Sequence, residues 1–350
     1  MKLIIPLLLL FTIPACNQEV KTPRQDKNKK NTDYINLSGK TMGTTYNVTY
    51  RDSEHRHFQT DINQLLATVN KAVSTYDDNS TISMFNKTDG KFQLPKNNVI
   101  FMKNFTLAKE VFEKSKGSFD PTVMPLVNYW GFGNKEKKAV TSIDIKKVAQ
   151  LKKYVGFEKV KFIMDEEKPY ITKSTKEVEL DFSACAKGGG VDAIAEFLQS
   201  KGIMDYLVDI GGELIAHGQS PSGGNWKVGI SIPKAAAATS DVHTVVKLNN
   251  KAIATSGNHR NYYKTKGYKY GHTLNPATGF PEKNNLLSAS VFAPNCMKAD
   301  AYATAFMVMG LEKALILAEE LPEIEAFFIY GNKDGSMDVK YTSGTDALLQ

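Results

Sequence analysis

The chain has 350 residues, of which 42% are hydrophobic and 23% are charged. These proportions are those of an ordinary globular protein, and they exclude a collagen, a coiled coil, a mostly disordered chain and a protein with several membrane spans. The net charge is +7, and residues 1–36 supply three of these net positive charges. The rest of the chain carries no dense basic stripe, so we expect no nucleic-acid partner.

The amino-terminal segment predicts export and lipid anchoring. Lys2 precedes an apolar run over residues 3–13, which is shorter than the roughly 20 residues that span a bilayer and is typical of a signal peptide. Ala15 and Cys16 then resemble the lipobox of bacterial lipoproteins, in which the chain is cut before a cysteine whose thiol is acylated. The alternative is an ordinary signal peptide followed by a chance cysteine.

We therefore expect a lipoprotein signal peptide over residues 1–15, and a lipidated Cys16 at the start of a flexible polar tether over residues 16–36. The lipid would anchor the protein to a cell membrane on its periplasmic or extracytoplasmic side. The two other cysteines, Cys185 and Cys296, could form a disulfide in an exported protein or remain as buried thiols.

The hydrophobic pattern of the remaining chain predicts both helices and strands. Apolar residues at helical spacing predict helices over residues 61–73, around 102–112 with Gly117 as the stop, and around 145–151. Alternation over residues 46–50 and short apolar runs predict strands at 178–182, 206–210, 226–232, 252–256 and 325–331. Because these elements mix without a regular βαβ repeat, we expect a single α+β domain over residues 37–350, with two closely joined lobes, mixed sheets and flanking helices.

Residues 180–198 could bind a phosphate. An apolar strand is expected to end at Asp181, and a turn of small residues with three glycines (residues 188–190) then leads into an amphipathic helix. Glycines let the backbone approach a ligand closely, and the start of a helix favours anions. Lys187 could pair with a phosphate there. The alternative is a tight strand-to-helix turn without a ligand.

Residues 297–310 could hold a metal ion. Their small and apolar side chains predict a buried helix, in which Asp300 and Thr304 lie on one face because they are four residues apart. A buried carboxylate is costly unless it is paired or bound to a metal, and carboxylate and hydroxyl oxygens suit Mg²⁺. The alternative is that Asp300 caps the helix and Thr304 bonds back to its carbonyl.

Two further features are less specific. His272 leads into an expected tight loop, and a histidine can act as a general base near neutral pH, although a lone histidine is more often structural. Aromatic residues also lie beside polar turns and could stack on a planar ligand or belong to the core; they are Tyr76, Phe119, Tyr129 and Trp130.

Eight short motifs together carry a family resemblance. In chain order they are MGTTY (42–46), STYDDNSTIS (74–83), FDPTVMPLVNYWGFG (119–133), DFSACAKGGGVD (181–192), VDIGGE (208–213), ATSGN (254–258), HTLNPATG (272–279) and ADAYATAFMVMG (299–310). In this order they resemble the ApbE family, the FAD:protein FMN transferases, from about residue 37 to about residue 330. The lipobox agrees with this resemblance, since many members are exported lipoproteins.

The resemblance implies a reaction and a set of site residues. FAD would donate FMN, through its phosphate, to a threonine or serine of an exported acceptor protein with a Ser/Thr-Gly-rich motif, and AMP would leave. Mg²⁺ would lie at the pyrophosphate, held by the side chains of Asp300 and Thr304 and the backbone carbonyl of Ala184. His272 would act on the acceptor hydroxyl. The residues implied to contact FAD are Met42, Tyr76, Phe119, Asp120, Pro121, Asp181, Lys187 and Leu274.

The sequence departs from the family pattern at a few positions. Cys185 stands at an apolar position, and Gly190 stands where a larger residue is common. Ala303 stands where some members carry a second acid, so we expect no second metal ion. Two alternatives to transfer are an FAD pyrophosphatase that yields FMN and AMP, and a flavin-binding lipoprotein without catalysis.

Overall fold

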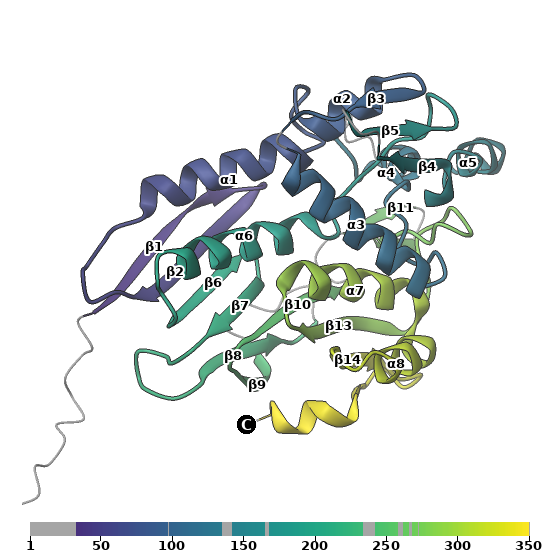
Figure 1. Ribbon diagram of the computed structural model, residues 1–350. Helices are drawn as coiled ribbons and strands as arrows, with labels where there is room; N and C mark the ends of the chain where they lie inside the picture. Colours follow the sequence, from purple (N-terminus) through teal and green to yellow (C-terminus); the bar gives the residue numbers. More distant parts are fainter. Residues whose placement is uncertain are drawn as a thin grey trace, which may run out of the picture. The chain divides into compact units, whose positions relative to one another are not determined.

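An eight-stranded sheet forms the centre of the computed structural model (Figure 1). Each neighbouring pair of its strands is antiparallel. Along one of them, Tyr46, Val48 and Tyr50 are buried and the residues between them are more exposed, as expected when successive side chains point to opposite faces. In sheet order the strands are β1 (Tyr34–Thr41), β2 (Thr44–Arg51), β6 (Tyr206–Ile210), β7 (Glu213–His217), β10 (Lys251–Gly257), β13 (Leu286–Ala293), β14 (Glu325–Gly331) and β15 (Met337–Tyr341).

The structure describes residues 33–96, 98–134, 142–164, 168–233, 242–257, 262–265, 268–271 and 273–349, with only the backbone described for 262–265 and 268–271. From Asp33 onward the chain forms one compact unit. The predicted signal peptide, the lipidated Cys16, most of the tether and His272 lie outside the described residues, so these remain predictions.

Helices cover one face of the central sheet. α1 (Gln59–Val73) and α6 (Ala186–Ser200) pack on its first strands, and α7 (Cys296–Met309) and α8 (Leu311–Glu320) pack on β10, β13 and β14 (Figure 1). On the other face lies a hairpin of β8 (Trp226–Ser231) and β9 (Val242–Leu248). Trp226 and Ile230 of this hairpin pack against Ile253 of the sheet. Helices α6 and α7, which carry predicted site residues, therefore lie on the face of the central sheet that the helices cover.

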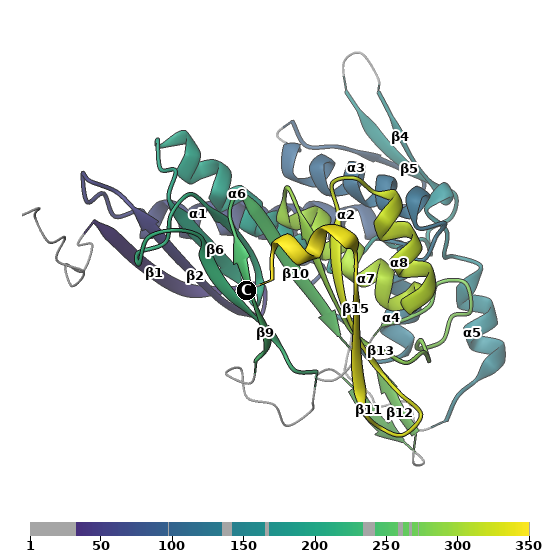
Figure 2. The same ribbon diagram turned by 90° about the horizontal axis from the view of Figure 1, so that it is seen from below.

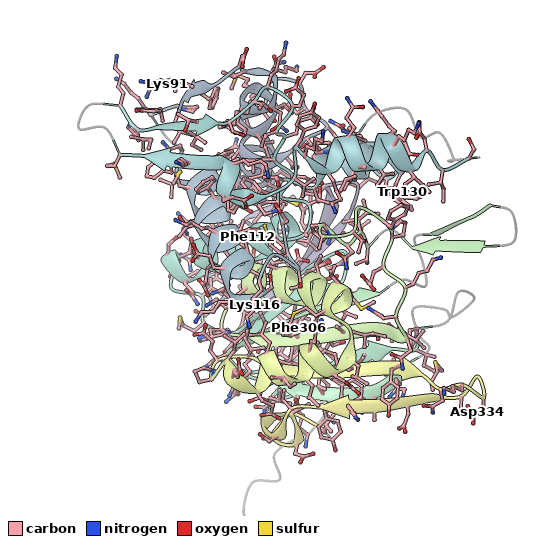
Figure 3. The ribbon with its side chains drawn as sticks, turned by 90° about the vertical axis from the view of Figure 1, so that its right-hand side faces the viewer. Lys91, Phe112, Lys116, Trp130, Phe306 and Asp334 are labelled. Carbon is pink, nitrogen blue, oxygen red and sulfur yellow. The ribbon has the colours of Figure 1, made fainter. Side chains whose placement is uncertain are left out.

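A smaller part of the fold lies at one end of this core. It comprises α2 (Thr81–Lys87), α3 (Val99–Lys114), α4 (Met124–Tyr129), α5 (Ile145–Lys152) and the sheet β3-β5-β4 (Lys91–Gln93, Tyr170–Lys173 and Val160–Ile163). The described residues also form the 3-10 turns η1 (Phe157–Lys159) and η2 (Ser343–Ala347). The hairpin of β11 (Tyr262–Thr265) and β12 (Tyr268–Gly271) projects from the body (Figures 2 and 3).

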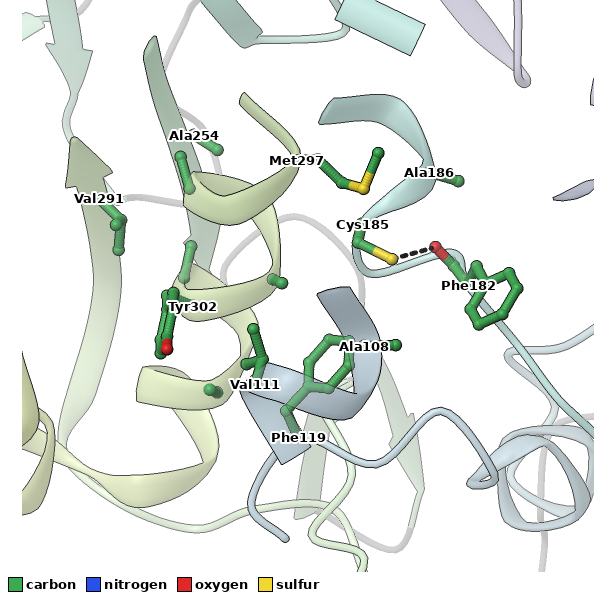
Figure 4. Packing of buried hydrophobic residues seen from close by; sticks show 14 of the residues in the cluster. Ala108, Val111, Phe119, Phe182, Cys185, Ala186, Ala254, Val291, Met297 and Tyr302 are labelled. Carbon is green, nitrogen blue, oxygen red and sulfur yellow. Dashed lines mark hydrogen bonds between the residues drawn. The ribbon is translucent and has the colours of Figure 1, made fainter. Parts of the chain in front are cut away.

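The main hydrophobic core surrounds α7, which is buried over most of its length. Tyr302 of α7 lies close to Val111 of α3 and Val291 of β13 (Figure 4), and Phe306 extends the same core (Figure 3). A helix that is apolar on nearly all sides is stable only when it is enclosed. The prediction of a buried helix here is confirmed.

The α+β fold class is confirmed, and so are most of the predicted elements. The three helices expected from periodicity are α1, α3 and α5. Gly117 follows α3 with φ of +80°, and its N–H donates to the Phe112 carbonyl at 2.9 Å, which is a common way to end a helix. The runs at 206–210, 226–232, 252–256 and 325–331 are β6, β8, β10 and β14.

The strand predicted at residues 178–182 was wrong. This segment is outside every described strand, although Val178, Leu180 and Phe182 are fully buried. A side chain replaces the missing strand partner: Asn86 Oδ1 accepts from the Leu180 N–H at 2.7 Å, and Asn86 Nδ2 donates to the Leu180 carbonyl at 2.8 Å. Burial alone produced the apolar pattern.

Two further observations concern the described residues. Cys185 and Cys296 are both free and buried, so the open alternative of a disulfide between them is excluded. Among the helices that the structure describes, none combines the length and the apolar character needed to cross a membrane.

Candidate functional site

A cleft of about 1080 Å³ opens beside the amino-terminal end of α6 and along one side of α7, where Asp300, Thr304 and Val308 line it. Met42 is not among its lining residues; it packs near Gly190 on α6 instead. His272 lies outside the described residues, one position before the lining residue Thr273. The predicted site residues that do line the cleft are Tyr76, Phe119, Asp120, Pro121, Asp181, Ala184, Lys187, Leu274, Asp300 and Thr304.

Two short loops form adjacent parts of the cleft wall. The Asp181 N–H donates to the Pro121 carbonyl at 2.7 Å, which joins the two loops. Asp181 Oδ1 accepts from the Ser183 N–H at 2.8 Å, and Asp120 Oδ1 accepts from the Thr122 N–H at 2.8 Å. Burial raises the pKa of Asp120 to about 6 and also raises that of Asp181. Both carboxyl groups are thus held by their own turns in a poorly solvated wall.

The three glycines at 188–190 do not form the turn that the sequence predicted. They lie inside the first turns of α6, and the turn into the helix comprises residues 181–185. A Cβ atom on Gly188 would lie 2.4 Å from the Cys296 carbonyl oxygen of α7. Gly188 therefore allows two helices to approach each other closely, rather than the backbone to approach a ligand.

Asp300 and Thr304 lie on the cleft wall one turn apart on α7. Asp300 is only 3% exposed, and its Oδ2 accepts from the Gly188 N–H of α6 at 3.0 Å. The Thr304 hydroxyl lies 3.2 Å from the Ser256 hydroxyl of β10. The alternative that Asp300 caps its own helix is excluded, because Asn295 caps α7 by accepting from the Lys298 N–H at 2.9 Å.

The donors near Asp300 suit a hard cation. In a regular helix the Gly188 N–H would donate to the Ala184 carbonyl, but here it donates to Asp300. Ala184, Asp300 and Thr304, which carry a backbone carbonyl, a carboxylate and a hydroxyl group, thus line the same cleft. Mg²⁺ is commonly held by one or two carboxylates with water and substrate phosphates. In the described part of the chain, no three His, Cys, Asp or Glu side chains group as a metal cage. The residues present therefore fit a cation that shares its ligands with a phosphate, rather than one enclosed by protein.

Glu213 was not predicted as a site residue. It begins β7 and lines the cleft, it is 7% exposed, and its Oε1 forms an ion pair with the Lys187 ammonium. Within the described residues, Glu213 Oε2 has no hydrogen-bond partner. Burial and the charge of Asp300 raise the pKa of Glu213 to about 7. Burial alone would lower the pKa of Lys187, but the charges of Asp300 and Glu213 raise it above its usual range.

The sequence contained a weak signal for Glu213. It ends the motif VDIGGE, and the two glycines before it have φ of +66° and +103°. That backbone conformation favours glycine and turns the chain from β6 into β7 at the cleft. The pairing of Glu213 with Lys187 joins residues 26 positions apart, which the local pattern does not indicate.

The aromatic residues divide into one exposed ring and several buried ones. Tyr76 is 70% exposed on the cleft wall, so one of its faces is available to a planar ligand. Phe119 and Trp130 are almost fully buried, and Trp130 donates its indole N–H to the Gly279 carbonyl at 2.8 Å (Trp130 is labelled in Figure 3). Of these three, Tyr76 alone is placed for stacking.

Comparison with known proteins agrees with this arrangement. The ApbE family matches residues 42–328. The FAD:protein FMN transferase of Haemophilus influenzae is 35% identical over 324 residues, covering 91% of this chain and 89% of the relative. The FAD:protein FMN transferase of Vibrio cholerae is 36% identical over 314 residues, covering 88% of this chain and 90% of the relative. The solved flavin transferase ApbE from Vibrio cholerae is similar with a TM-score of 0.80 and 33% identity, over 90% of this chain and 99% of that one. The chain therefore belongs to the ApbE family.

Proposed function

We propose that the chain is a Mg²⁺-dependent FAD:protein FMN transferase. It attaches FMN through its phosphate to a threonine or serine of an exported acceptor protein and releases AMP. The observation that carries this proposal is the convergence of Ala184, Lys187, Asp300 and Thr304 on one wall of the cleft, in a chain whose family relatives are FAD:protein FMN transferases.

The charge of the cleft supports a requirement for a cation. Among its described lining residues, Lys187 carries the only basic side chain. Five lining residues carry carboxyl groups: Asp120, Asp181, Asp209, Glu213 and Asp300. A diphosphate is itself an anion, so such a wall repels it unless positive charge is added. When bound, Mg²⁺ supplies that charge and polarises the phosphoryl oxygens. Its proposed ligands are the side chains of Asp300 and Thr304 and the Ala184 carbonyl.

The protein's own residues bind and orient the reactants. Lys187, fixed by Glu213, faces the diphosphate, and Tyr76 offers an exposed ring to a flat part of FAD. In the transfer, the acceptor hydroxyl oxygen bonds to the FMN phosphorus while the bond from that phosphorus to the AMP oxygen breaks. His272 is the proposed base that takes the hydroxyl proton. In phosphoryl transfer the protein contributes mainly by positioning the reactants and stabilising charge, and it need not form a covalent bond itself.

The proposed location follows from the amino terminus. The lipobox around Cys16 and the polar tether support an exported lipoprotein that is held at a membrane surface, where exported acceptors are accessible. Labelling cells with a radioactive or alkyne-bearing fatty acid tests this. We expect label on the protein, and loss of the label in Cys16→Ser.

Incubation of the purified protein with FAD, Mg²⁺ and an acceptor carrying a Ser/Thr-Gly-rich motif tests the activity. Mass spectrometry of the acceptor is expected to show one added FMN, less one water, on a single threonine or serine. Free FMN and AMP with an unmodified acceptor would instead indicate a pyrophosphatase. Bound FAD that stays intact would indicate a flavin-binding protein without turnover.

A further inference from the structure

Helices α6 and α7 are joined near their amino-terminal ends by two contacts that mirror each other. Asp192 of α6 accepts hydrogen bonds from the backbone N–H groups of Cys296, at 2.7 Å, and Met297, at 2.8 Å, on α7. In return, Asp300 of α7 accepts from the Gly188 N–H of α6 at 3.0 Å. In each helix the carboxylate lies four residues after the backbone group, so both occupy the same face.

The first contact supplies a cap that α7 could not make alone. The first N–H groups of a helix have no partner within the helix, and a carboxylate is favourable beside them. Asn295 accepts from the third of these groups, on Lys298, which leaves those of Cys296 and Met297 to Asp192. The start of α7 is therefore fixed by a side chain of α6.

The two helices have no space in which to shift at this junction. Gly188 is buried, and a Cβ atom there would lie 2.4 Å from the Cys296 carbonyl oxygen and 2.7 Å from the Met297 Cα atom. Met297 lies near the start of α6 at Cys185 and Ala186 (Figure 4). A movement of α7 along α6 would break the bonds to Asp192 and the bond to Asp300 together.

We propose that Asp192 is a positioning residue for the cation site. It holds α7 against α6, so that Asp300 keeps Oδ2 on the Gly188 N–H and directs Oδ1 towards the cation, beside the turn that carries the Ala184 carbonyl. Asp192 does not line the cleft, so it acts through Asp300. This inference rests on the proposed function for the presence of Mg²⁺.

The test compares two buried aspartates that each accept from two backbone N–H groups. Asp192→Asn keeps the shape and one acceptor oxygen, but it places an amide NH₂ against one of the two backbone donors. The control is Asp52→Asn, because Asp52 is 4% exposed and accepts from the backbone N–H groups of Glu54 and Arg56, away from the cleft. Asp52 is also paired with the Arg56 guanidinium, so its substitution removes a buried carboxylate's contacts without touching the junction of α6 and α7. Thermal unfolding and Mg²⁺ binding by titration calorimetry, with FAD present, are measured for both variants and the parent.

We expect Mg²⁺ to bind Asp192→Asn at least about tenfold more weakly, as when the supporting partner of a metal ligand is removed. Asp52→Asn is expected to lose stability but to keep the parent affinity for Mg²⁺. The rate of FMN transfer by Asp192→Asn is expected to recover as the concentration of Mg²⁺ is raised. A second variant, Cys296→Pro, removes one donor at the first position of α7, where proline is tolerated, and is expected to weaken Mg²⁺ binding as well.

Two results would overturn the inference in different ways. If Asp192→Asn loses stability but binds Mg²⁺ as tightly as the parent, Asp192 has a purely structural role, and the inference fails while the proposed function stands. If the parent itself binds no Mg²⁺ in the presence of FAD, the proposed function fails, and this inference fails with it.

Discussion

The substitution Gly188→Ala tests whether the close approach of α6 and α7 builds the site. Its Cβ atom would lie 2.4 Å from the Cys296 carbonyl oxygen, whereas ordinary van der Waals contacts begin at 3.4 Å, so the two backbones must separate by about 1 Å. Overpacking of this kind costs roughly 1–3 kcal/mol. Alanine recovers about 1 kcal/mol through its higher helix propensity. We therefore expect a net loss of stability of up to about 2 kcal/mol.

The substitution should also weaken the binding of FAD. The 3.0 Å bond between the Gly188 N–H and Asp300 would lengthen with the same separation, and Asp300 would leave its place on the wall. Urea unfolding gives the stability change, and quenching of flavin fluorescence with and without Mg²⁺ gives FAD affinity. We expect FAD binding in Mg²⁺ to weaken by about tenfold or more.

Gly190→Ala is the matched control on the same helix. Its Cβ atom would meet only the flexible ends of Ile210 and Met42, each at 3.0 Å. We expect this variant to keep FAD affinity and nearly all of its stability. If Gly188→Ala is as stable as Gly190→Ala and binds FAD equally well, the close packing of the helices does not shape the site.

Four other substitutions test three single residues. Asp300→Asn and Asp300→Ala should both abolish Mg²⁺-dependent transfer. Only Asp300→Ala should also lower the free energy of unfolding in urea, by about 1–3 kcal/mol, because it leaves the buried Gly188 N–H without an acceptor. Full transfer by either variant would refute the metal assignment. His272→Ala should slow transfer with little change in FAD affinity and flatten the rate between pH 6 and 9; a parent-like rate and pH profile would argue against a base there. Because burial raises the pKa of Asp120 from 3.8 to about 6, the folded state binds its proton more tightly than the unfolded state, and stability falls as pH rises through that range. Between pH 4 and pH 7, the free energy of unfolding in urea should therefore fall less in Asp120→Asn than in the parent, by up to about 3 kcal/mol. An unchanged pH dependence would show that the pKa of Asp120 is not raised.

The sequence predicted those parts of the site that depend on local spacing. Asp300 and Thr304 had to share a face once their helix was recognised, and that helix was recognisable because nearly all of its residues are small or apolar. The loop at residues 181–185 was also expected next to a helix start. Each of these predictions concerns a single element, so the residue types and their spacing within that element were sufficient to make it.

The parts that failed depend on contacts between distant segments. The glycines at 188–190 suggested a ligand, but the groups that approach them belong to the protein, and Gly188 faces the Cys296–Met297 backbone of another helix. Residues 178–182 looked like a strand because they are buried, whereas the side chain of Asn86 serves as their partner. The pair of Lys187 and Glu213 joins α6 to β7 and has no local pattern.

A crystal structure of the protein with FAD and Mn²⁺ in place of Mg²⁺ would show where the metal binds, because anomalous scattering locates it. We expect a metal ion about 2.1 Å from an Asp300 carboxylate oxygen, with a diphosphate oxygen and the Ala184 carbonyl as further ligands. A metal bound elsewhere, or a diphosphate that lies away from the junction of α6 and α7, would contradict this expectation.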